Sequence, residues 1–556
     1  MNLLREEDSL FLFNFQKVFI LSVLLFLVNQ KNDLDFVTQI EKKISILCKS
    51  LNQSYWNASL SGKEEDYSNY AKFEIELKKL ASDKNSFEIL KKLKEENFGE
   101  VLNRKIKLLY FLFLSEQGDF ELSQKITKKI TKAELKFNTF RAEISERKLT
   151  ENEIKNILKE EENSEKLKEA WQAIKKQGKI VEKDILEIIE LRNERARNLG
   201  FRNYYELSLE LSEQNEKEIE IIFEELEKLT NEPFKKLKEE IDEVLQKKYR
   251  VDKEELRPWH YTDPFFQEGP SIYEINLDKI YSKENIVEIA VKYYENIGLD
   301  VKGILNRSDL YEKPGKNQHA YCINIDRNGD VRTLQNIKNS ERWMETILHE
   351  LGHGIYSENH DKNLPWMLRD SAHIFTTEAI AMLFGRKARN FEFIKNYCNV
   401  NKKEIDEIEK TTRKILKLRQ LVFARWVQVM FHFEKELYKN PKQDLNKLWW
   451  DLVKKFQFID FYRDEPDWAS KYHFLSAPIY YHNYLLGELL ASQIHNFITQ
   501  NYTHDKNSDY SGNKKIGDYL KEKIFSVGAK YRWDEMIEKA TGEKLTAKYF
   551  AEEFCS

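Results

Sequence analysis

Residues 349–353 read His-Glu-Leu-Gly-His, and these residue types at this spacing can do chemistry. On an α-helix, His349 and His353 are offset by about 40° and about 6 Å, so both imidazoles can reach one tetrahedral zinc ion. Glu350 lies about 100° around the helix, where its carboxylate can take a proton from an attacking water without becoming a ligand. The spacing therefore predicts a hydrolytic zinc site, although chance produces these five residues in roughly a few per cent of chains this long.

A catalytic zinc needs a third protein ligand and an open fourth position. A metzincin would carry Gly and His where this chain has Tyr356 and Asn359, so that pattern is absent. The preferred candidate is Glu378, 25 residues after His353 in the segment FTTEAIAMLFG, whose small residues permit close helix packing. Glu358 is a poorer candidate because it lies on the wrong side of the same helix.

The elements that must position these residues are mainly helices. The chain has only 18 Gly and 9 Pro in 556 residues, and from about 35 to 250 apolar residues recur three and four apart between charged ones. Ser340 is a candidate N-cap for the helix that carries the two histidines. We predict a mainly α protein without internal repeats or a flexible linker.

Two segments interrupt the helical pattern. Residues 256–276 gather Pro and aromatic residues and are expected to form an ordered loop. In residues 319–340, the stretches YCINI and VRTLQNI are expected to be short strands, and Asn328-Gly329 between them favours a tight hairpin turn.

The composition argues against several classes of function. The chain has 90 Lys and Arg against 94 Asp and Glu, so a nucleic-acid partner has no electrostatic support. Its four cysteines are scattered without Cys-x-x-Cys spacing, which suggests neither a cysteine zinc site nor a disulfide framework.

Residues 1–35 form an N-terminal extension with a largely apolar run at 18–28, which a membrane anchor would have to extend back to residue 10. The flank before this run, REEDS, is acidic where a signal peptide is basic, and no small-x-small cleavage site follows. We therefore favour a cytoplasmic location, with export or membrane anchoring through residues 10–28 as the alternative and the one route to membrane contact.

Beyond the zinc motif, four segments resemble the glutamate-zincin peptidases of the angiotensin-converting-enzyme family and its relatives, thimet oligopeptidase and oligopeptidase F. They are LPWMLRDSAHIFTTEA (364–379), HAYC (319–322), KYHFLSAPIYYHNYLLGE (471–488) and SYWNASLSG (54–62). The resemblance implies a metallopeptidase domain over residues 36–556, with two non-contiguous helical lobes that close over a deep channel, a small β element and a zinc site at 349–378. It implies oligopeptide substrates.

The resemblance also implies roles for individual residues. Tyr484 and His473 match the tyrosine and histidine that, with zinc, stabilise the oxyanion. His319 and Ala320 match strand positions that bind the substrate backbone, although His319 could equally be an ordinary polar loop residue. The alternative for the aromatic residues is packing in the helical core.

A carboxylate clamp would decide how the enzyme cuts. Lys471, Tyr481 and Gln267 match the residues that hold the free C-terminus of the substrate in converting enzyme, although the spacing leaves Tyr480 or Tyr481 open. With the clamp, the protein is expected to be a peptidyl-dipeptidase that releases C-terminal dipeptides. Without it, the same site is expected to act as an oligopeptidase that makes internal cuts. A catalytically silent binding protein of the same fold is the third alternative.

One position departs from the family pattern. Converting enzyme has an aspartate four residues after its glutamate ligand to orient a zinc histidine, and this chain has Met382 there. Asp370 is a possible substitute, and the spacing of 25 residues between His353 and Glu378 agrees better with thimet oligopeptidase. The residues that orient the two histidines must therefore differ from those of converting enzyme.

Overall fold

The computed structural model describes residues 4–273 and 275–555, with side chains from Asn32 onward. The chain divides into two compact units. One comprises Met1–Gln117 with two short segments, Pro314–Lys316 and Lys362–Arg369, and the other comprises the rest. All residues that the sequence predicts to be chemically active belong to the second unit. The two-lobe channel stays a prediction.

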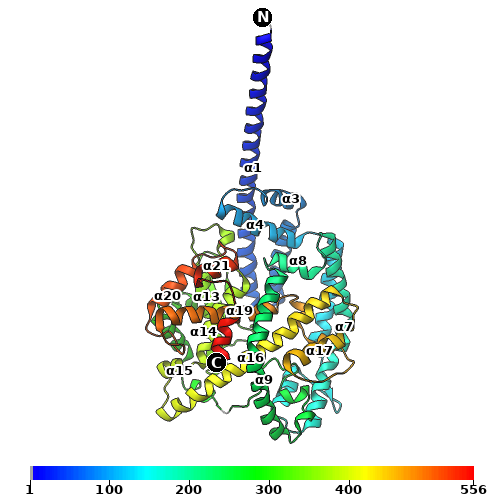
Figure 1. Ribbon diagram of the computed structural model, residues 1–556, viewed down its shortest axis with the longest axis vertical. Helices are drawn as coiled ribbons and strands as arrows, with labels where there is room; N and C mark the ends of the chain where they lie inside the picture. The colour runs from blue at the N-terminus through cyan, green and yellow to red at the C-terminus, as the bar shows by residue number, and fades with distance from the viewer. Residues whose placement is uncertain (1–3, 274, 556) are drawn as a thin grey trace. The chain divides into compact units, whose positions relative to one another are not determined.

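The first unit consists of helices (Figure 1). They are α1 (Leu4–Ser61), α2 (Glu64–Ala81), α3 (Lys84–Leu93), α4 (Glu100–Glu116) and the 3₁₀ turn η3 (Trp366–Leu368). Where side chains are described, no helix is long and apolar enough to cross a membrane. The segment 10–28 lies outside those side chains.

The second unit is also mainly helical, which confirms the predicted fold class. Its longer helices are α5 (Phe120–Thr139), α6 (Glu151–Glu160), α7 (Ser164–Asn198), α8 (Tyr204–Leu211), α9 (Glu216–Tyr249), α11 (Ile286–Asn296), α13 (Glu341–Glu358), α14 (Ile374–Gly385), α16 (Lys402–Lys439), α17 (Leu445–Gln457), α19 (His482–Ile498) and α21 (Trp533–Thr541). Its shorter helices are α10 (Asp278–Tyr281), α12 (Lys302–Arg307), α15 (Phe391–Tyr397), α18 (His473–Ser476), α20 (Lys514–Leu520) and α22 (Lys548–Phe554). Short 3₁₀ and π turns complete it: η1 (Lys253–Glu255), η2 (Pro258–Tyr261), η4 (Arg386–Arg389), η5 (Asp467–Ser470), η6 (Thr499–Thr503) and η7 (Lys521–Phe525).

Local capping explains where the main helices begin. The Ser340 side chain accepts a hydrogen bond from the Trp343 N–H at 3.3 Å, so α13 begins at the predicted cap. Asn401 and Glu404 form a reciprocal capping box at the start of α16. Figure 1 shows α16 running across the unit against α9.

The strands form two small hairpins. The predicted one pairs β3 (Tyr321–Asn324) with β4 (Val331–Leu334), antiparallel. Its turn is wider than a tight Asn-Gly turn, because Arg327 (φ 54°) and Gly329 (φ 109°) take the left-handed conformation, and the Asp326 carboxylate accepts from two N–H groups of the turn. The other hairpin, β1 (Ala142–Ile144) with β2 (Arg147–Leu149), interrupts a region that we expected to be wholly helical.

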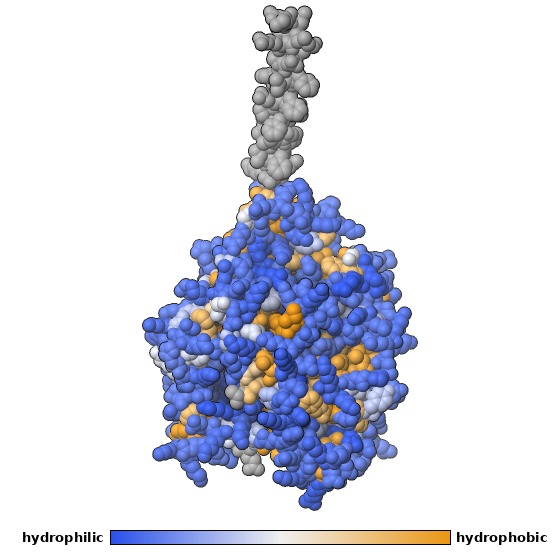
Figure 2. Space-filling view, viewed as in Figure 1, coloured by the Kyte–Doolittle hydropathy of each residue, from blue (hydrophilic) through white to orange (hydrophobic). Residues whose placement is uncertain are grey.

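The segment 256–276 is ordered, as expected. Trp259, Tyr261 and Phe266 are buried, and the η2 turn is the one regular element in its described part. The surface face in Figure 2 is largely hydrophilic with small hydrophobic patches, which fits the 33% charged residues of the sequence.

Candidate active site

The side chains of His349, His353 and Glu378 meet in one cluster. The two Nε2 atoms lie 3.2 Å apart, and the Glu378 Oε2 atom lies 3.7 Å from that of His349 and 3.8 Å from that of His353. Among the described residues, this is the one group of three His, Cys, Asp or Glu side chains able to hold a metal ion.

Close packing of three helices brings these side chains together. A Cβ on Gly352 would lie only 2.8 Å from the Cα of Ala381, so the glycine lets α13 approach the backbone of α14. On the other side of α14, a Cβ on Gly487 of α19 would lie 3.2 Å from the Cβ of Glu378. The helix α14 is apolar almost all round, as a helix packed between two others must be.

The donor set fits a small tetrahedral cation. Ligand atoms about 2.0–2.2 Å from such an ion are about 3.3–3.6 Å apart, close to the three separations found here. Burial lowers the pKa of His349 to about 4, despite the nearby Glu345 carboxylate, and burial together with His349 lowers the pKa of His353 well below its ordinary value. Both imidazoles are therefore neutral at pH 7, with lone pairs available for a metal.

Thr377 orients His353. The His353 Nδ1 atom lies 2.7 Å from the Thr377 hydroxyl oxygen. Because Nε2 faces the other two ligands, the proton of the neutral ring belongs on Nδ1, where it donates to this oxygen. Sequence reasoning missed Thr377, since nothing in its spacing distinguishes it from the other threonines.

The residues considered for this orienting role lie elsewhere. The Met382 sulfur faces α19, where it would lie 3.3 Å from a Cβ on Gly487. Asp370 forms an ion pair with Arg327 at 2.5 Å. Neither of them has a hydrogen bond to a zinc-binding histidine among the described contacts, whereas the Thr377 hydroxyl has one to His353.

Glu350 lies on α13 between the two histidines but outside the ligand group. Its side chain is buried, and burial followed by the charge of Glu378 raises its pKa to about 8. Burial and the Glu488 carboxylate likewise raise the pKa of Glu378 to about 7. Two carboxylates held together in a dry site favour a bound cation, which opposes both shifts.

His473, Tyr481 and Tyr484 form a row of rings beside this cluster. The ring centroids are 4.8 Å apart between His473 and Tyr481, and 5.4 Å between Tyr481 and Tyr484. Burial and then the Glu378 charge raise the pKa of both Tyr480 and Tyr484, so these two hydroxyls keep their protons at pH 7 and can act as donors. Burial lowers the pKa of His473 to about 4, which keeps its ring neutral.

The three residues of the expected clamp also meet. The Lys471 ammonium donates to the Gln267 Oε1 atom at 2.6 Å and lies 5.0 Å from the centre of the Tyr481 ring. Burial lowers the pKa of Lys471 to about 8, while the Asp263 carboxylate acts in the opposite direction. Tyr481, rather than Tyr480, is thus the tyrosine beside the lysine.

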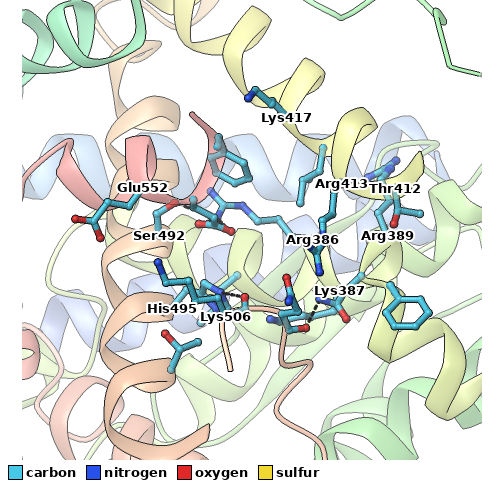
Figure 3. A pocket seen from close by; sticks show the side chains of 18 of the residues that line it. Arg386, Lys387, Arg389, Thr412, Arg413, Lys417, Ser492, His495, Lys506 and Glu552 are labelled. Carbon is cyan, nitrogen blue, oxygen red and sulfur yellow. Dashed lines mark hydrogen bonds and ion pairs between the residues drawn. The ribbon is translucent and has the colours of Figure 1, made fainter. Parts of the chain in front are cut away.

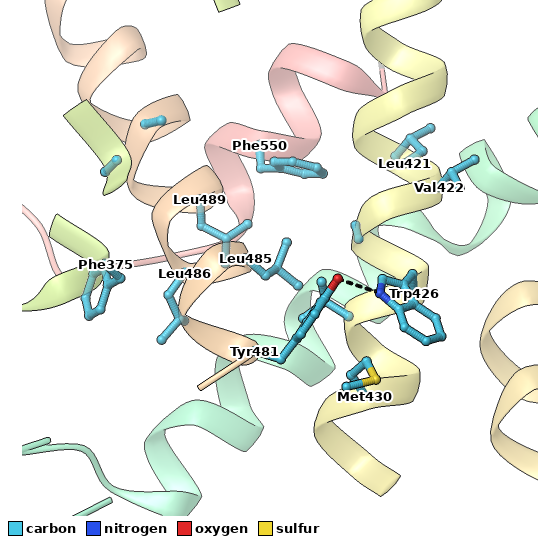
Figure 4. Close-up of a cluster of buried hydrophobic side chains, with 14 of the residues drawn as sticks. Phe375, Leu421, Val422, Trp426, Met430, Tyr481, Leu485, Leu486, Leu489 and Phe550 are labelled. Carbon is cyan, nitrogen blue, oxygen red and sulfur yellow. Dashed lines mark hydrogen bonds between the residues drawn. The ribbon is translucent and has the colours of Figure 1, made fainter. Parts of the chain in front are cut away.

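Tyr481 is held in place from α16. The Trp426 indole N–H donates to its hydroxyl oxygen at 2.9 Å, within the apolar cluster that α16 and α19 build (Figure 4). The Tyr481 O–H remains available as a donor. Trp426 is a second positioning residue that the sequence did not reveal.

A cavity of about 760 Å³ is lined by one residue of each group, His349 from the ligands and Gln267 from the expected clamp. Its described lining holds five acidic and five basic side chains. A second cavity, of about 520 Å³, adjoins it, and Arg386 and Arg389 line both (Figure 3).

His319 and Ala320 directly precede β3, which packs against α13. His319 is exposed and Ala320 is half-buried. In the described chain β4 is the one strand that pairs with β3, so the other edge of β3 has no neighbouring strand. An extended peptide could add to that edge through backbone hydrogen bonds.

Comparison with known proteins supports this picture. The model of peptidase family M3 matches residues 157–555, and that of angiotensin-converting enzyme matches residues 28–260. Carboxypeptidase 1 of Bacillus subtilis is 23% identical over 49% of the chain and 57% of its own length. The oligoendopeptidase F homolog of Borreliella burgdorferi is 27% identical over 48% of the chain and 44% of its own length. The chain thus spans about half the length of these relatives, and the resemblance seen in the sequence is confirmed.

Proposed function

Because the chain belongs to peptidase family M3, we propose that it is a zinc metallopeptidase that hydrolyses short peptides at the His349, His353 and Glu378 site. Zinc, when bound by these three residues, would supply Lewis-acid polarisation of the peptide carbonyl and of the attacking water. The remaining steps belong to side chains of this chain.

Glu350 is the general base of the proposed reaction. It takes a proton from the water that attacks the carbonyl carbon and then passes it to the leaving amine. Tyr484 donates its O–H, and His473 an N–H, to the oxyanion that forms. His319 and Ala320 would align the substrate backbone along the edge of β3.

We propose further that the enzyme is a peptidyl-dipeptidase. The observation that carries this is the single cavity lined by both the ligand His349 and the clamp residue Gln267, which is itself bonded to Lys471. A substrate carboxylate held by Lys471, Gln267 and Tyr481 would fix the distance from the chain end to the scissile bond. The oligopeptidase alternative keeps support from the second relative, which is named an oligoendopeptidase.

The general-base role is tested with Glu350→Gln. We expect full metal content, measured by elemental analysis, with a loss of about 10²–10⁴-fold in kcat. Near-normal turnover with metal bound would refute the mechanism. No chelator-sensitive cleavage by the unmodified protein would favour a silent binding protein.

Cleavage mode is tested by mass spectrometry of the products from one decapeptide, with a free or an amidated C-terminus. We expect successive C-terminal dipeptides and slow cleavage of the amide. Lys471→Gln should lower kcat/KM for the free peptide by about 10- to 100-fold, as expected for a lost bond to a charged group. The matched control is Lys454→Gln, an exposed lysine paired with Asp460. Internal cuts, or equal cleavage of the amide, would favour the oligopeptidase.

A further inference from the structure

The second cavity carries a strong positive charge. Its described lining contains seven Lys and Arg side chains against Glu552 and Glu553, in a chain with a net charge of −4. His495, which also lines it, is neutral at pH 7 because burial lowers its pKa to about 4. Figure 3 shows basic side chains approaching the cavity from α16 and from the turn after α14.

Two of the seven cations are matched by carboxylates. Arg386 bonds to Glu488 and Glu553, and Arg389 to Glu341 and Glu345. The other five form no ion pair within the described part of the chain: Lys387, Arg413, Lys414, Lys417 and Lys506.

Lys387 is the deepest of these five cations. It is 4% exposed, and its ammonium donates to the Ser508 carbonyl oxygen at 3.0 Å and lies 3.7 Å from the centre of the Tyr510 ring. Neither of these two partners carries a negative charge, although the carboxylates of Glu553, Asp509 and Asp505 act on Lys387 without forming an ion pair with it. The Lys387 ammonium has three N–H donors and uses one of them for Ser508, so an anion bound in the cavity would stabilise it by accepting from the others.

We propose that this cavity binds a small molecule with two or more phosphate groups. Each phosphate offers about one to two negative charges and several acceptors to the unpaired cations, and lysines serve well as point charges for such groups. Leu416, Phe391 and Phe554 form an apolar part of the wall that suits an organic group attached to the phosphates. The volume of about 520 Å³ lies within the range of small-molecule sites.

The charge pattern separates this site from the peptide cavity. The cavity at His349 has balanced lining charges, as suits a passage for varied peptides, whereas the neighbouring one has five more positive than negative side chains. Arg386 and Arg389 lie in the wall between them, and both are held by carboxylates.

The test is calorimetric titration of the metal-loaded protein with sodium tripolyphosphate and, separately, with ATP. We expect saturable binding at one site per chain that is at least tenfold tighter than sulfate binding at equal ionic strength. Lys417→Glu and Arg413→Glu should each weaken it by tenfold or more. The control, Lys410→Glu, reverses an exposed charge on the same helix outside the cavity and should leave the affinity unchanged.

The two titrants distinguish the sources of the phosphate. Tighter binding of ATP would assign the apolar wall to a nucleoside, and equal binding would indicate an inorganic polyphosphate. Since polyphosphates also bind metals, equal affinities in Lys417→Glu and Lys410→Glu would show that the titrant binds outside this cavity and would overturn the proposal. Displacement of tripolyphosphate by a substrate peptide would overturn it as well, because the cavity would then be part of the peptide channel.

Discussion

Replacing Thr377 with valine should weaken metal binding while leaving the fold intact. The hydroxyl oxygen lies 2.7 Å from the His353 Nδ1 atom, and valine has the same shape without an acceptor. In the metal-free protein, the ring can move its proton to Nε2 and so avoid an unpaired N–H. In the metal-bound protein it cannot, because Nε2 must present its lone pair.

The free-energy cost of the missing hydroxyl therefore destabilises only the metal-bound state. A buried N–H left without an acceptor costs about 1–3 kcal/mol, which corresponds to a fall in metal affinity of about 10- to 100-fold. The measurement is a competition titration of zinc against a chromogenic chelator, with circular dichroism as the check on folding.

Two comparisons sharpen the result. Thr377→Ser keeps the hydroxyl and should retain most of the affinity. Thr131→Val removes an exposed hydroxyl that bonds within its own helix, and it should change nothing at the metal. If Thr377→Val binds zinc as tightly as the unmodified protein, then Thr377 does not orient His353.

Two further predictions concern packing and pH. Gly352→Ala places a Cβ 2.8 Å from the Cα of Ala381, so α13 and α14 must separate. We expect the free energy of unfolding, measured by thermal unfolding, to fall by about 1–3 kcal/mol and the metal content to fall as well. The control Gly303→Ala, whose new Cβ would have contacts no closer than 3.4 Å, should change neither quantity. Burial lowers the pKa of His482 to about 3 from its ordinary 6.5, so the unfolded chain binds the extra proton between these values and stability falls as the pH drops below 6.5. Denaturant unfolding measures the free energy of unfolding at pH 7 and at pH 5. Between these pH values it should fall by about 1–2 kcal/mol less in His482→Gln than in the unmodified protein. An equal fall in both proteins would contradict this role of His482.

The parts of the site that the sequence predicted follow from helical periodicity. The four-residue spacing of His349 and His353 fixes their relative position within one element, and the Ser340 cap fixes where that element begins. Helical periodicity alone could not identify Glu378 as the third ligand, because Glu378 lies on another helix. The small residues around it indicated close packing, and the structure shows this at Gly352 and Ala381.

The parts that the sequence missed depend on contacts between elements. Thr377 and Trp426 each form a hydrogen bond to a site residue on another helix, His353 and Tyr481. Such a contact depends on how the helices pack, and neither residue type is distinctive at its position in the sequence. The β1–β2 hairpin was missed because its turn, Ser145-Glu146, has two residues with positive φ where Asn-Gly would have been recognisable. Tyr480 and Tyr481 could be told apart only when the position of Lys471 was known.

The hydroxyl at Thr377 also has an electrostatic consequence. Burial, together with the Glu378 charge, already raises the pKa of Glu350 to about 8, and burial, together with the Glu488 charge, raises that of Glu378 to about 7. A third carboxylate behind His353 would add negative charge to the same dry volume and raise both values further. Thr377 orients the imidazole without adding charge, and Met382 occupies the remaining space against α19 with an apolar side chain. Placing aspartate at 382 should therefore raise the pKa of Glu350 further, and it should give the His353 N–H no new partner, since Thr377 already accepts from it.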